Sequence, residues 1–268
     1  MERLGIINYF GAIVNFAGKT LTIAELEARK LHHDFTELIT RAVQPALWLL
    51  IFGEVLAKVG AIPTGNLPYL DYMAPGILAQ SALFVAIFYG IAIIWERDLG
   101  IVHKFLASPA PRSALVLGKA LSAGERGLAQ AVIVYALAFC LGVHLNWNIF
   151  SLLLVVVVII LGSALFSTFS LIIACLVKTR ERFMGIGQIL TMPLFFASNA
   201  IYPIAIMPKW LQVVSQINPL TYMTDALRAL MIMNGPTVYG VPYDLLFLLV
   251  ANTVNVAVAA RLYPRVVI

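Results

Sequence analysis

Long apolar runs, separated by short polar segments, recur along the whole chain. Each of six runs is close to twenty residues or longer and carries few charged side chains. A run of that length predicts a helix that crosses the ~30 Å hydrocarbon core of a membrane. Such a segment has to be helical, because no water satisfies an open backbone N–H or C=O group inside the bilayer. We place the six predicted spans at 42–59, 72–95, 113–143, 149–177, 183–204 and 243–262.

The overall composition favours the same class of protein. Hydrophobic residues make up 61% of the 268 and charged residues 12%, whereas about 25% of a soluble domain is charged. We therefore predict an all-α integral membrane protein with one transmembrane domain, residues 1–268, rather than a soluble protein with buried helices. Its two cysteines, Cys140 and Cys175, fall near opposite ends of their predicted spans. That separation is too large for a disulfide.

Lysine and arginine are unevenly distributed about the six predicted spans. All but Lys58, Lys209 and Arg228 fall in four places: before the first span, at the end of the chain, from the loop after span two into the start of span three, or in the segment after span four. Cytoplasmic segments carry the excess of these residues in membrane proteins. We therefore expect a multi-pass protein of the cell (inner or plasma) membrane with both termini in the cytoplasm.

Residues 1–40 precede the first span and are expected in the cytoplasm or at the membrane interface. Apolar residues recur at helical spacing over 21–39, opposite a charged side. This pattern predicts an amphipathic helix that lies flat on the membrane surface. His32 and His33 fit its water-facing side better than a metal site, because adjacent helical residues point in different directions. The role of the first twenty residues stays open.

A charged segment at 96–112 joins the second and third predicted spans. Its pattern predicts a short amphipathic helix at 97–106, and Pro109 and Pro111 end that helix. A short rigid helix between two spans can pass a force from a soluble partner to both of them. The alternative is an inert connecting loop.

The segment at 205–235 is too polar and too broken to span the membrane. Pro208 and Pro219 each suit the start of a helix. We predict two short helices that dip from the outer face as a re-entrant hairpin, packed against other spans. Asp225 and Arg228 lie three apart on the second helix and are expected to pair.

A few ionisable residues fall within the predicted spans. Glu54 in the first span is followed one turn later by Lys58, which favours an ion pair at the outer helix end; the alternative is a substrate-facing role. Arg112, Lys119 and Arg126 recur every seven residues and so share one face of the third span. They could reach anionic headgroups or line a lateral cytoplasmic entrance for amphipathic substrates.

The sequence encodes no nucleotide site. Residues 18–20, Gly-Lys-Thr, resemble the end of a phosphate-binding loop, but Ile13 stands where that loop needs glycine. The other Gly-Lys pair, at 118–119, is followed by Ala120, which lacks a hydroxyl for magnesium. No spacing typical of catalytic, cofactor-binding or metal-ligating residues occurs either. We therefore expect a protein that is not an enzyme and that takes its energy from elsewhere.

Two stretches carry a recognisable pattern, one from the outer start of span two into span three and one before span six. The matching positions are Pro75, Gly76, Glu96, Arg97, Gly100, Leu106, Ser108, Pro109, Arg112, Gly118 and Lys119, and the 218–230 segment NPLTYMTDALRAL. In these positions, in size and in six-span topology, the chain resembles the permeases of type-2 ABC exporters. It is similar in character to the small permeases of the daunorubicin-resistance and nodulation-factor-export kind.

This resemblance implies partners and a source of energy. The permease would pair with a second permease chain, as a homodimer or with a sister permease, and two copies of a separate ATP-binding cassette subunit would drive it. ATP and Mg²⁺ would bind to that subunit, and no cofactor to this chain. The helix at 97–106 would be the coupling helix, and the surface helix at 21–39 a second contact. The expected coupling residues are Glu96, Arg97, Gly100, His103, Lys104 and Phe105.

The resemblance also suggests roles for two other segments. The sequence ERFMG at 181–185 echoes ERDLG at 96–100, an echo that fits either chance or a further contact with the ATP-binding subunit. The hairpin at 205–235 would be an outer gate, and its candidate residues are Asn218, Pro219, Tyr222, Asp225 and Arg228.

Together these features predict a permease that exports an amphipathic drug-, lipid- or glycolipid-like substrate from the cytoplasm. Its expected fold is six transmembrane helices with an N-terminal amphipathic interface helix, a cytoplasmic coupling helix and an outer re-entrant helical hairpin. The alternative is a non-ABC membrane component, either an assembly factor or an ion-coupled carrier. The lipid bilayer is an expected partner and nucleic acid is not. The identity of the cargo and the choice between homodimer and heterodimer stay open.

Overall fold

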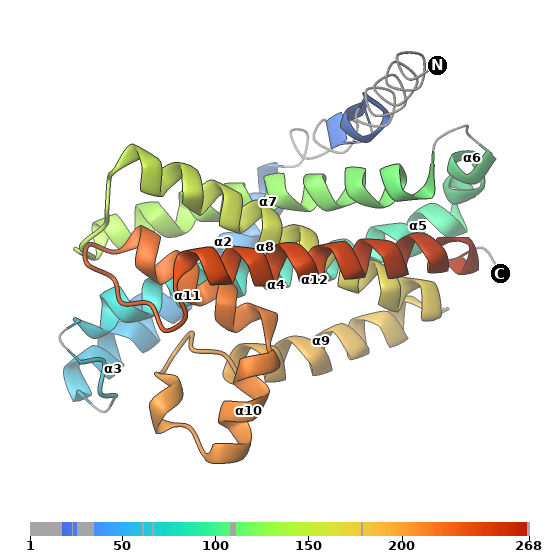
Figure 1. Cartoon of the computed structure of the whole chain (residues 1–268). Coiled ribbons are helices and arrows are strands. Elements are labelled where there is room, and N and C mark those ends of the chain that lie inside the picture. Colours follow the sequence, from blue (N-terminus) through green and yellow to red (C-terminus); the bar gives the residue numbers. More distant parts are fainter. Residues whose placement is uncertain are drawn as a thin grey trace, which may run out of the picture.

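The described part of the chain is an all-α bundle of long, roughly parallel helices, with shorter helices at its ends and along one side (Figure 1). It is taken from a computed structural model, which describes residues 18–22, 24–25, 35–60, 62–65, 67–107, 111–177 and 179–266. Within these ranges the only extended pairing is a single antiparallel bridge between Leu145 and Ile232. The predicted all-α class is therefore confirmed.

The elements follow one another along the chain with short connections. They are α2 (Phe35–Leu47), the π-helix η1 (Trp48–Gly53), α3 (Glu54–Val59), α4 (Tyr69–Tyr89), α5 (Ile91–Asp98), α6 (Ile101–Ala107), α7 (Arg112–Cys140), α8 (Ile149–Leu176), α9 (Arg180–Phe196), the 3₁₀ turn η2 (Ile204–Ile206), α10 (Lys209–Ile217), α11 (Pro219–Met231), α12 (Val241–Leu262) and the 3₁₀ turn η3 (Tyr263–Val266).

Four helical stretches in the described ranges are long and apolar enough to cross a membrane, namely Thr40–Val59, Tyr69–Asp98, Ile149–Leu176 and Val241–Leu262. They coincide with the first, second, fourth and sixth predicted spans. The third predicted span is the 29-residue helix α7, whose first half carries charged side chains. The fifth is the 17-residue helix α9, which ends at Phe196 rather than near 204.

The second of these stretches forms the centre of the bundle. Of its most apolar window, 78% is buried, compared with 17% for the first and last stretches. A helix that is hydrophobic on all sides is expected at the centre of a bundle, and α4 packs against α7, α8, α9 and α11. At Gly76 of α4 an added Cβ would lie 2.2 Å from the carbonyl oxygen of Ala200. The glycine is therefore needed for the close approach of these two segments.

The predicted helix at 97–106 is divided into two, which corrects that expectation. Helix α5 ends at Asp98, where the backbone N–H groups of Leu99 and Gly100 bond back to Trp95 and Arg97. Gly100 has φ +70°, in the left-handed region that favours glycine, and α6 begins immediately after it. Glu96 and Arg97 therefore belong to the end of the second span, and His103 to a separate short helix.

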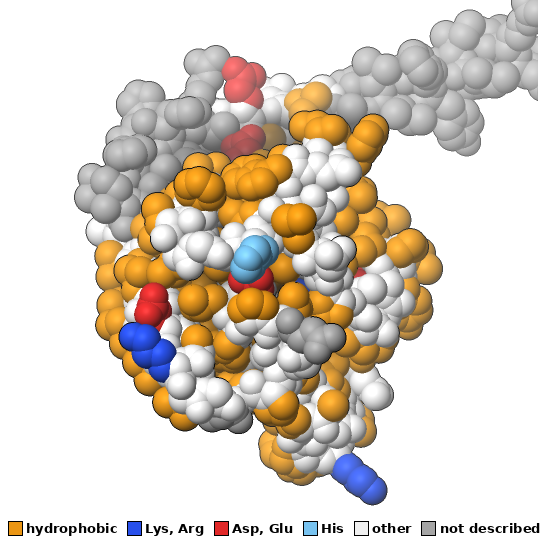
Figure 2. All heavy atoms as spheres, turned by 90° about the vertical axis from the view of Figure 1, so that its left-hand side faces the viewer, with side chains coloured by type: hydrophobic (Ala, Val, Ile, Leu, Met, Phe, Trp, Pro, Cys, Tyr) orange, Lys and Arg blue, Asp and Glu red, His pale blue; other side chains and the backbone are white. Residues whose placement is uncertain are grey.

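The predicted outer segment does contain two short helices. Helix α10 follows Pro208 directly and α11 begins at Pro219, as their sequence predicted. At the same end of the bundle, the turn after α7 is tied to the end of α11, because Asn146 donates to the carbonyl of Met231 and Met233 to that of His144. Figure 2 shows this end of the molecule, where few charged side chains appear among the hydrophobic ones.

Some predicted features lie outside the described residues. They include most of the surface helix at 21–39 with His32 and His33, the first seventeen residues, and Ser108 and Pro109. Of the 21–39 segment, the last five residues are the start of α2. Both cysteines are free, as predicted.

Candidate functional site

The coupling residues predicted from the sequence lie at the right-hand end of the bundle in Figure 1, where α5, α6 and η3 meet the first turns of α7 and α9. A second, smaller hydrophobic cluster fills this end. Val102 of α6 is completely buried in it, together with Leu115 of α7, Phe183 of α9 and Tyr263 of η3. Helix α6 is therefore anchored to the bundle by an apolar side chain.

A buried ion pair connects α5 with α7. The Nζ atom of Lys119 lies 2.7 Å from Oε2 of Glu96, and the two side chains are 6% and 8% exposed. Two charges removed from water are stable only as a pair, because either one alone would leave an uncompensated buried charge. Glu96 therefore cannot touch a soluble partner directly, and its contribution to coupling would be to hold α5 against α7.

The predicted basic face of α7 is not open to the surroundings, which corrects the expectation for two of its three members. Lys119 is occupied by Glu96, and Arg126 is buried with its guanidinium 4.6 Å from the ring centre of Tyr89. Only Arg112, at the start of the helix, is exposed. The seven-residue spacing did identify one helix face, but that face turns toward α4 and α5.

A charged cluster that the sequence analysis did not identify joins α5 to α9. Arg180 Nη2 lies 2.6 Å from Asp98 Oδ2, and Arg97 Nη2 lies 3.0 Å from Asp98 Oδ1. The Arg180 guanidinium also lies 3.5 Å from the ring centre of Trp95. The only sequence signal was opposite charge at two helix ends 82 positions apart. The segment ERFMG at 181–185, which echoes ERDLG at 96–100, begins one residue after Arg180.

The remaining predicted coupling residues lie on or beside α6. His103 and Lys104 are exposed and Gly100 is half-buried, while the side chain of Phe105 lies outside the described part. The described residues contain no group of three or more His, Cys, Asp or Glu suited to a metal. The surface is one that could receive a partner protein.

The predicted outer-gate residues belong to α11 and its N-cap, and are separate from the coupling residues on α5 and α6. Asn218 caps this helix by accepting from the Leu220 N–H, and its amide nitrogen donates to the carbonyl of Leu194 on α9 at 2.6 Å. Pro219 is the first residue of α11. The Tyr222 hydroxyl donates to the carbonyl of Gln216 on α10. These contacts fasten α11 to α9 and α10.

The expected ion pair between Asp225 and Arg228 is wrong, since each bonds elsewhere. The Asp225 carboxylate accepts from the hydroxyl of Thr237 and from the N–H groups of Val238 and Tyr239, all within 3.0 Å. The fully buried Arg228 donates to the carbonyl of Asn199 at 2.6 Å. Arg228 is therefore not an outer surface charge, and Asp225 holds the loop that leads to α12.

The Arg228 guanidinium has a further partner on the central helix, α4. Arg228 Nε donates to the carbonyl of Tyr72, and the guanidinium lies 3.8 Å from the ring centre of the same residue. One buried cation thus joins α11 to α4 and to the segment after α9. Such a cluster fixes the relative position of three elements.

Glu54 forms the predicted ion pair with Lys58. The oxygen and nitrogen lie 3.7 Å apart, and the side chains are 42% and 82% exposed, respectively. A pair this exposed contributes about 1 kcal/mol at most. A substrate-facing role for Glu54 stays a prediction.

Comparisons with known proteins identify the family of the chain. The model of the ABC-2 type transporter family matches residues 19–232. Over 202 residues, the chain is 30% identical to ycf38 of Cyanophora paradoxa, named as a transport permease; the match covers 72% of this chain and 67% of the relative.

Two further relatives are more distant. The daunorubicin resistance ABC transporter permease protein DrrB1 of Streptomyces coeruleorubidus is 24% identical over 74% of this chain and 70% of its own. The inner membrane transport permease YadH of Escherichia coli K12 is 21% identical over 78% of this chain and 82% of its own. The family match includes α4 to α11, which carry both predicted sites. The chain therefore belongs to the ABC-2 type transporter family of transport permeases.

Proposed function

We propose that this chain is the permease subunit of an ATP-driven exporter whose energy comes from a separate ATP-binding cassette subunit. The observation that carries the proposal is the construction of α6, which exposes His103 and Lys104 while Val102 anchors it in the bundle. A push on such a helix would move the helices packed around it rather than bend a loose loop. The similarity to DrrB1, which is named as an ABC transporter permease, supports the same proposal.

The proposed topology has six spans, with both termini and α6 in the cytoplasm. Helix α7 has 29 residues and α9 has 17; at 1.5 Å per residue these are about 43 and 25 Å long. The first can cross a bilayer and the second nearly so. The few charged side chains in Figure 2 support an outer location for that end of the bundle, since Lys and Arg concentrate on cytoplasmic segments.

The proposed assembly contains two permease chains and two ATP-binding subunits. A surface suited to a second copy runs along the first span and α9, which meet where the rings of Trp48 and Phe195 lie 5.5 Å apart. Helix α9 buries only the stripe of Phe183, Gly187, Thr191 and Phe195 against the rest of the chain. Its other sides, including a polar residue, Gln188, are exposed. A glutamine is costly against lipid, and a facing permease chain would provide it with partners.

The proposed cargo is amphipathic, drug-, lipid- or glycolipid-like, and moves out of the cytoplasm. The membrane-spanning helices present large apolar surfaces and few charges, which suits a cargo with a hydrophobic part. Of the three predicted entrance residues only Arg112 is exposed, so we retain it alone as an entrance candidate. The cluster on α11 would act as the outer gate.

The docking surface of α6 can be tested by charge reversal. The test uses a strain that co-expresses the ATP-binding subunit. We expect the double variant His103→Glu, Lys104→Glu to reduce the amount of that subunit that co-purifies with the permease at least fivefold. Lys209→Glu, an exposed lysine at the other end of the bundle, is the matched control and should change nothing. Equal recovery with both variants would contradict docking at α6. Absence of any co-purifying ATPase would favour an ion-coupled carrier or an assembly factor.

A further inference from the structure

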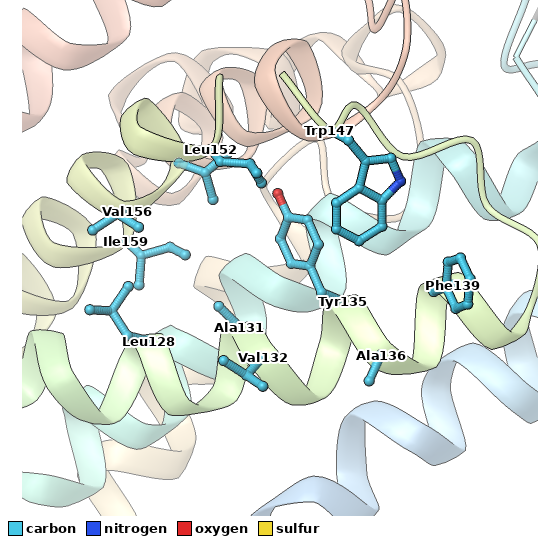
Figure 3. A pocket seen from close by; sticks show the side chains of 11 residues that line it. Leu128, Ala131, Val132, Tyr135, Ala136, Phe139, Trp147, Leu152, Val156 and Ile159 are labelled. Atoms are coloured by element: carbon cyan, nitrogen blue, oxygen red, sulfur yellow. The ribbon is translucent and has the colours of Figure 1, made fainter. Parts of the chain in front are cut away.

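A groove with a volume of about 590 Å³ lies between α7 and α8, in the halves next to the turn that joins them (Figure 3). One wall is built by α7 side chains three or four positions apart, from Leu128 to Phe139. The other is built by α8 from Leu152 to Ile159, and Trp147 of the connecting turn closes the end. The lining is hydrophobic or aromatic throughout. Water solvates a groove with this apolar lining poorly.

The groove opens away from the centre of the bundle. Val132, Phe139 and Trp147, at its edge, are 71%, 66% and 60% exposed, whereas Ile159, at its floor, is fully buried. Because α8 is long and apolar enough to span a membrane, we expect hydrocarbon outside the groove. Its natural occupant is therefore a hydrocarbon chain.

One polar group points into this apolar groove. Figure 3 shows the ring of Tyr135 crossing from α7 toward Leu152, so that its hydroxyl enters the space between the two helices. That hydroxyl oxygen is buried and has no hydrogen-bond partner in the described part of the chain. An unmatched buried hydroxyl is costly, and an acceptor atom carried by a ligand would satisfy it.

The depth of Tyr135 matches the boundary between headgroups and hydrocarbon. It lies five residues before the end of α7, or about 7.5 Å by helix rise, and its ring packs edge-on against Trp147 at 6.3 Å. Trp and Tyr concentrate at this boundary in membrane proteins. A further seven residues separate Tyr135 from Leu128, about 10 Å of groove toward the middle of the membrane.

Charge also limits the ligand. Residues 128–160 contain no Asp, Glu, Lys or Arg, and His144, the one imidazole among them, already contacts the Asp71 carboxylate at 2.8 Å. The neighbouring polar residues, Asn146 and Asn148, carry neutral amides, and both already bond within the turn. A lipid bound here is held by its tail and its ester region and is not selected for the charge of its headgroup.

We propose that this groove binds one acyl chain of a glycerophospholipid, with the ester carbonyl accepting a hydrogen bond from the Tyr135 hydroxyl. The chain lies between Val132 and Val156 and reaches toward Ile159. The site is separate from the proposed coupling helix and from α11, and it does not depend on what the permease transports.

The proposal can be tested with the full chain in nanodiscs of phosphatidylcholine that carries a photoactivatable group near the end of one acyl chain. We expect labelled peptides to map to α7 and α8 around the groove. Ala136→Trp, an exposed position on the groove wall, should reduce this labelling about tenfold. Ala257→Trp, an exposed alanine on α12 outside the groove, is the matched control and should leave it unchanged. Tyr135→Phe, which removes only the hydroxyl, should reduce it about fivefold.

Four results would overturn the proposal. Labelling spread evenly over α12 and the groove would show ordinary contact with bulk lipid, as would unchanged labelling in Ala136→Trp. Efficient disulfide-linked dimers of Ala136→Cys in a cysteine-free background would show that a second copy covers this face. Strong preference for an anionic lipid over phosphatidylcholine in native mass spectrometry would contradict binding by the tail and ester alone. Melting temperatures of the tryptophan variants verify folding, so a misfolded protein is not mistaken for a filled groove.

Discussion

At the scale of single residues, buried ionisable side chains hold neighbouring helices together. Lys119 and Glu96 join α7 to α5, and Arg228 joins α11 to α4 and to the segment after α9. Each replaces water by specific partners at positions where an unpaired charge would be unstable. These contacts explain why two groups that an amphipathic pattern assigns to an open face are buried instead.

The first prediction concerns the stability that the buried Lys119–Glu96 ion pair provides. Lys119→Met should lower the free energy of unfolding in detergent by about 3–5 kcal/mol, because Glu96 would keep a buried charge without this partner. Adding Glu96→Leu to that variant should recover most of the loss. Chemical unfolding followed by tryptophan fluorescence measures both. If the double variant is as unstable as the single one, the pair does not act as a unit.

The second prediction concerns the close packing of Gly76 against the backbone of Ala200. Gly76→Ala should destabilise the protein by about 1–3 kcal/mol, since the new methyl group must displace the backbone at Ala200. Gly185→Ala is the matched control, because it also lies in a helix but its methyl group would meet nothing within 4 Å. That variant should be neutral or slightly stabilised. Melting temperatures in detergent compare the two, and equal shifts would exclude a packing role for Gly76.

At the scale of elements, the cluster of Arg97, Asp98 and Arg180 connects the end of the second span with the start of α9. Helix α9 makes few other contacts with the bundle and leads to the short helices α10 and α11. A displacement of α5 and α6 can therefore reach the opposite end of the molecule along α9. The contact is exposed, which limits its strength but leaves it free to break and reform.

Charge substitution tests this connection. We expect Asp98→Asn to reduce transport about two- to fivefold while ATP hydrolysis by the partner subunit continues, because an exposed ion pair is a weak connection between two helices. Exchanging the charges, with Asp98→Arg and Arg180→Asp together, should restore part of the transport. Transport assays in vesicles with a fluorescent amphipathic dye, alongside phosphate release, give both quantities. A parallel loss of hydrolysis would point to docking rather than transmission.

The sequence predicted the elements better than their partners. Apolar run length located the first, second, fourth and sixth spans, and Pro208 and Pro219 located the starts of α10 and α11. These features depend on local chemistry. The break before α6 depends on the left-handed conformation of Gly100, and glycine accepts many backbone conformations.

The charged contacts were harder to predict for a related reason. Partner choice for Lys119, Asp225 and Arg180 depends on how each helix is rotated within the bundle. A seven-residue repeat defines a face but not the direction in which it points. Asp225 was therefore expected to pair with Arg228, and Lys119 was expected on an open face, whereas both bond to other segments.

At the scale of the whole molecule, the proposed topology has one end of the bundle in the cytoplasm and the other outside. In a cysteine-free background, His103→Cys should react with a membrane-impermeant maleimide only from the cytoplasmic side. Lys209→Cys, exposed at the opposite end, should react only from outside. Reaction of both from one side would contradict the six-span topology, since an odd number of crossings separates these two residues in it.

The central claim is that the chain moves its cargo with energy released in another subunit. The most direct measurement reconstitutes the purified permease in sealed vesicles, with and without its ATP-binding subunit, and records ATP hydrolysis and dye movement together. We expect no hydrolysis by the permease alone, and dye movement only when the ATP-binding subunit and ATP are both present. Hydrolysis by the permease alone, or dye movement driven by a proton gradient without the second subunit, would contradict this claim.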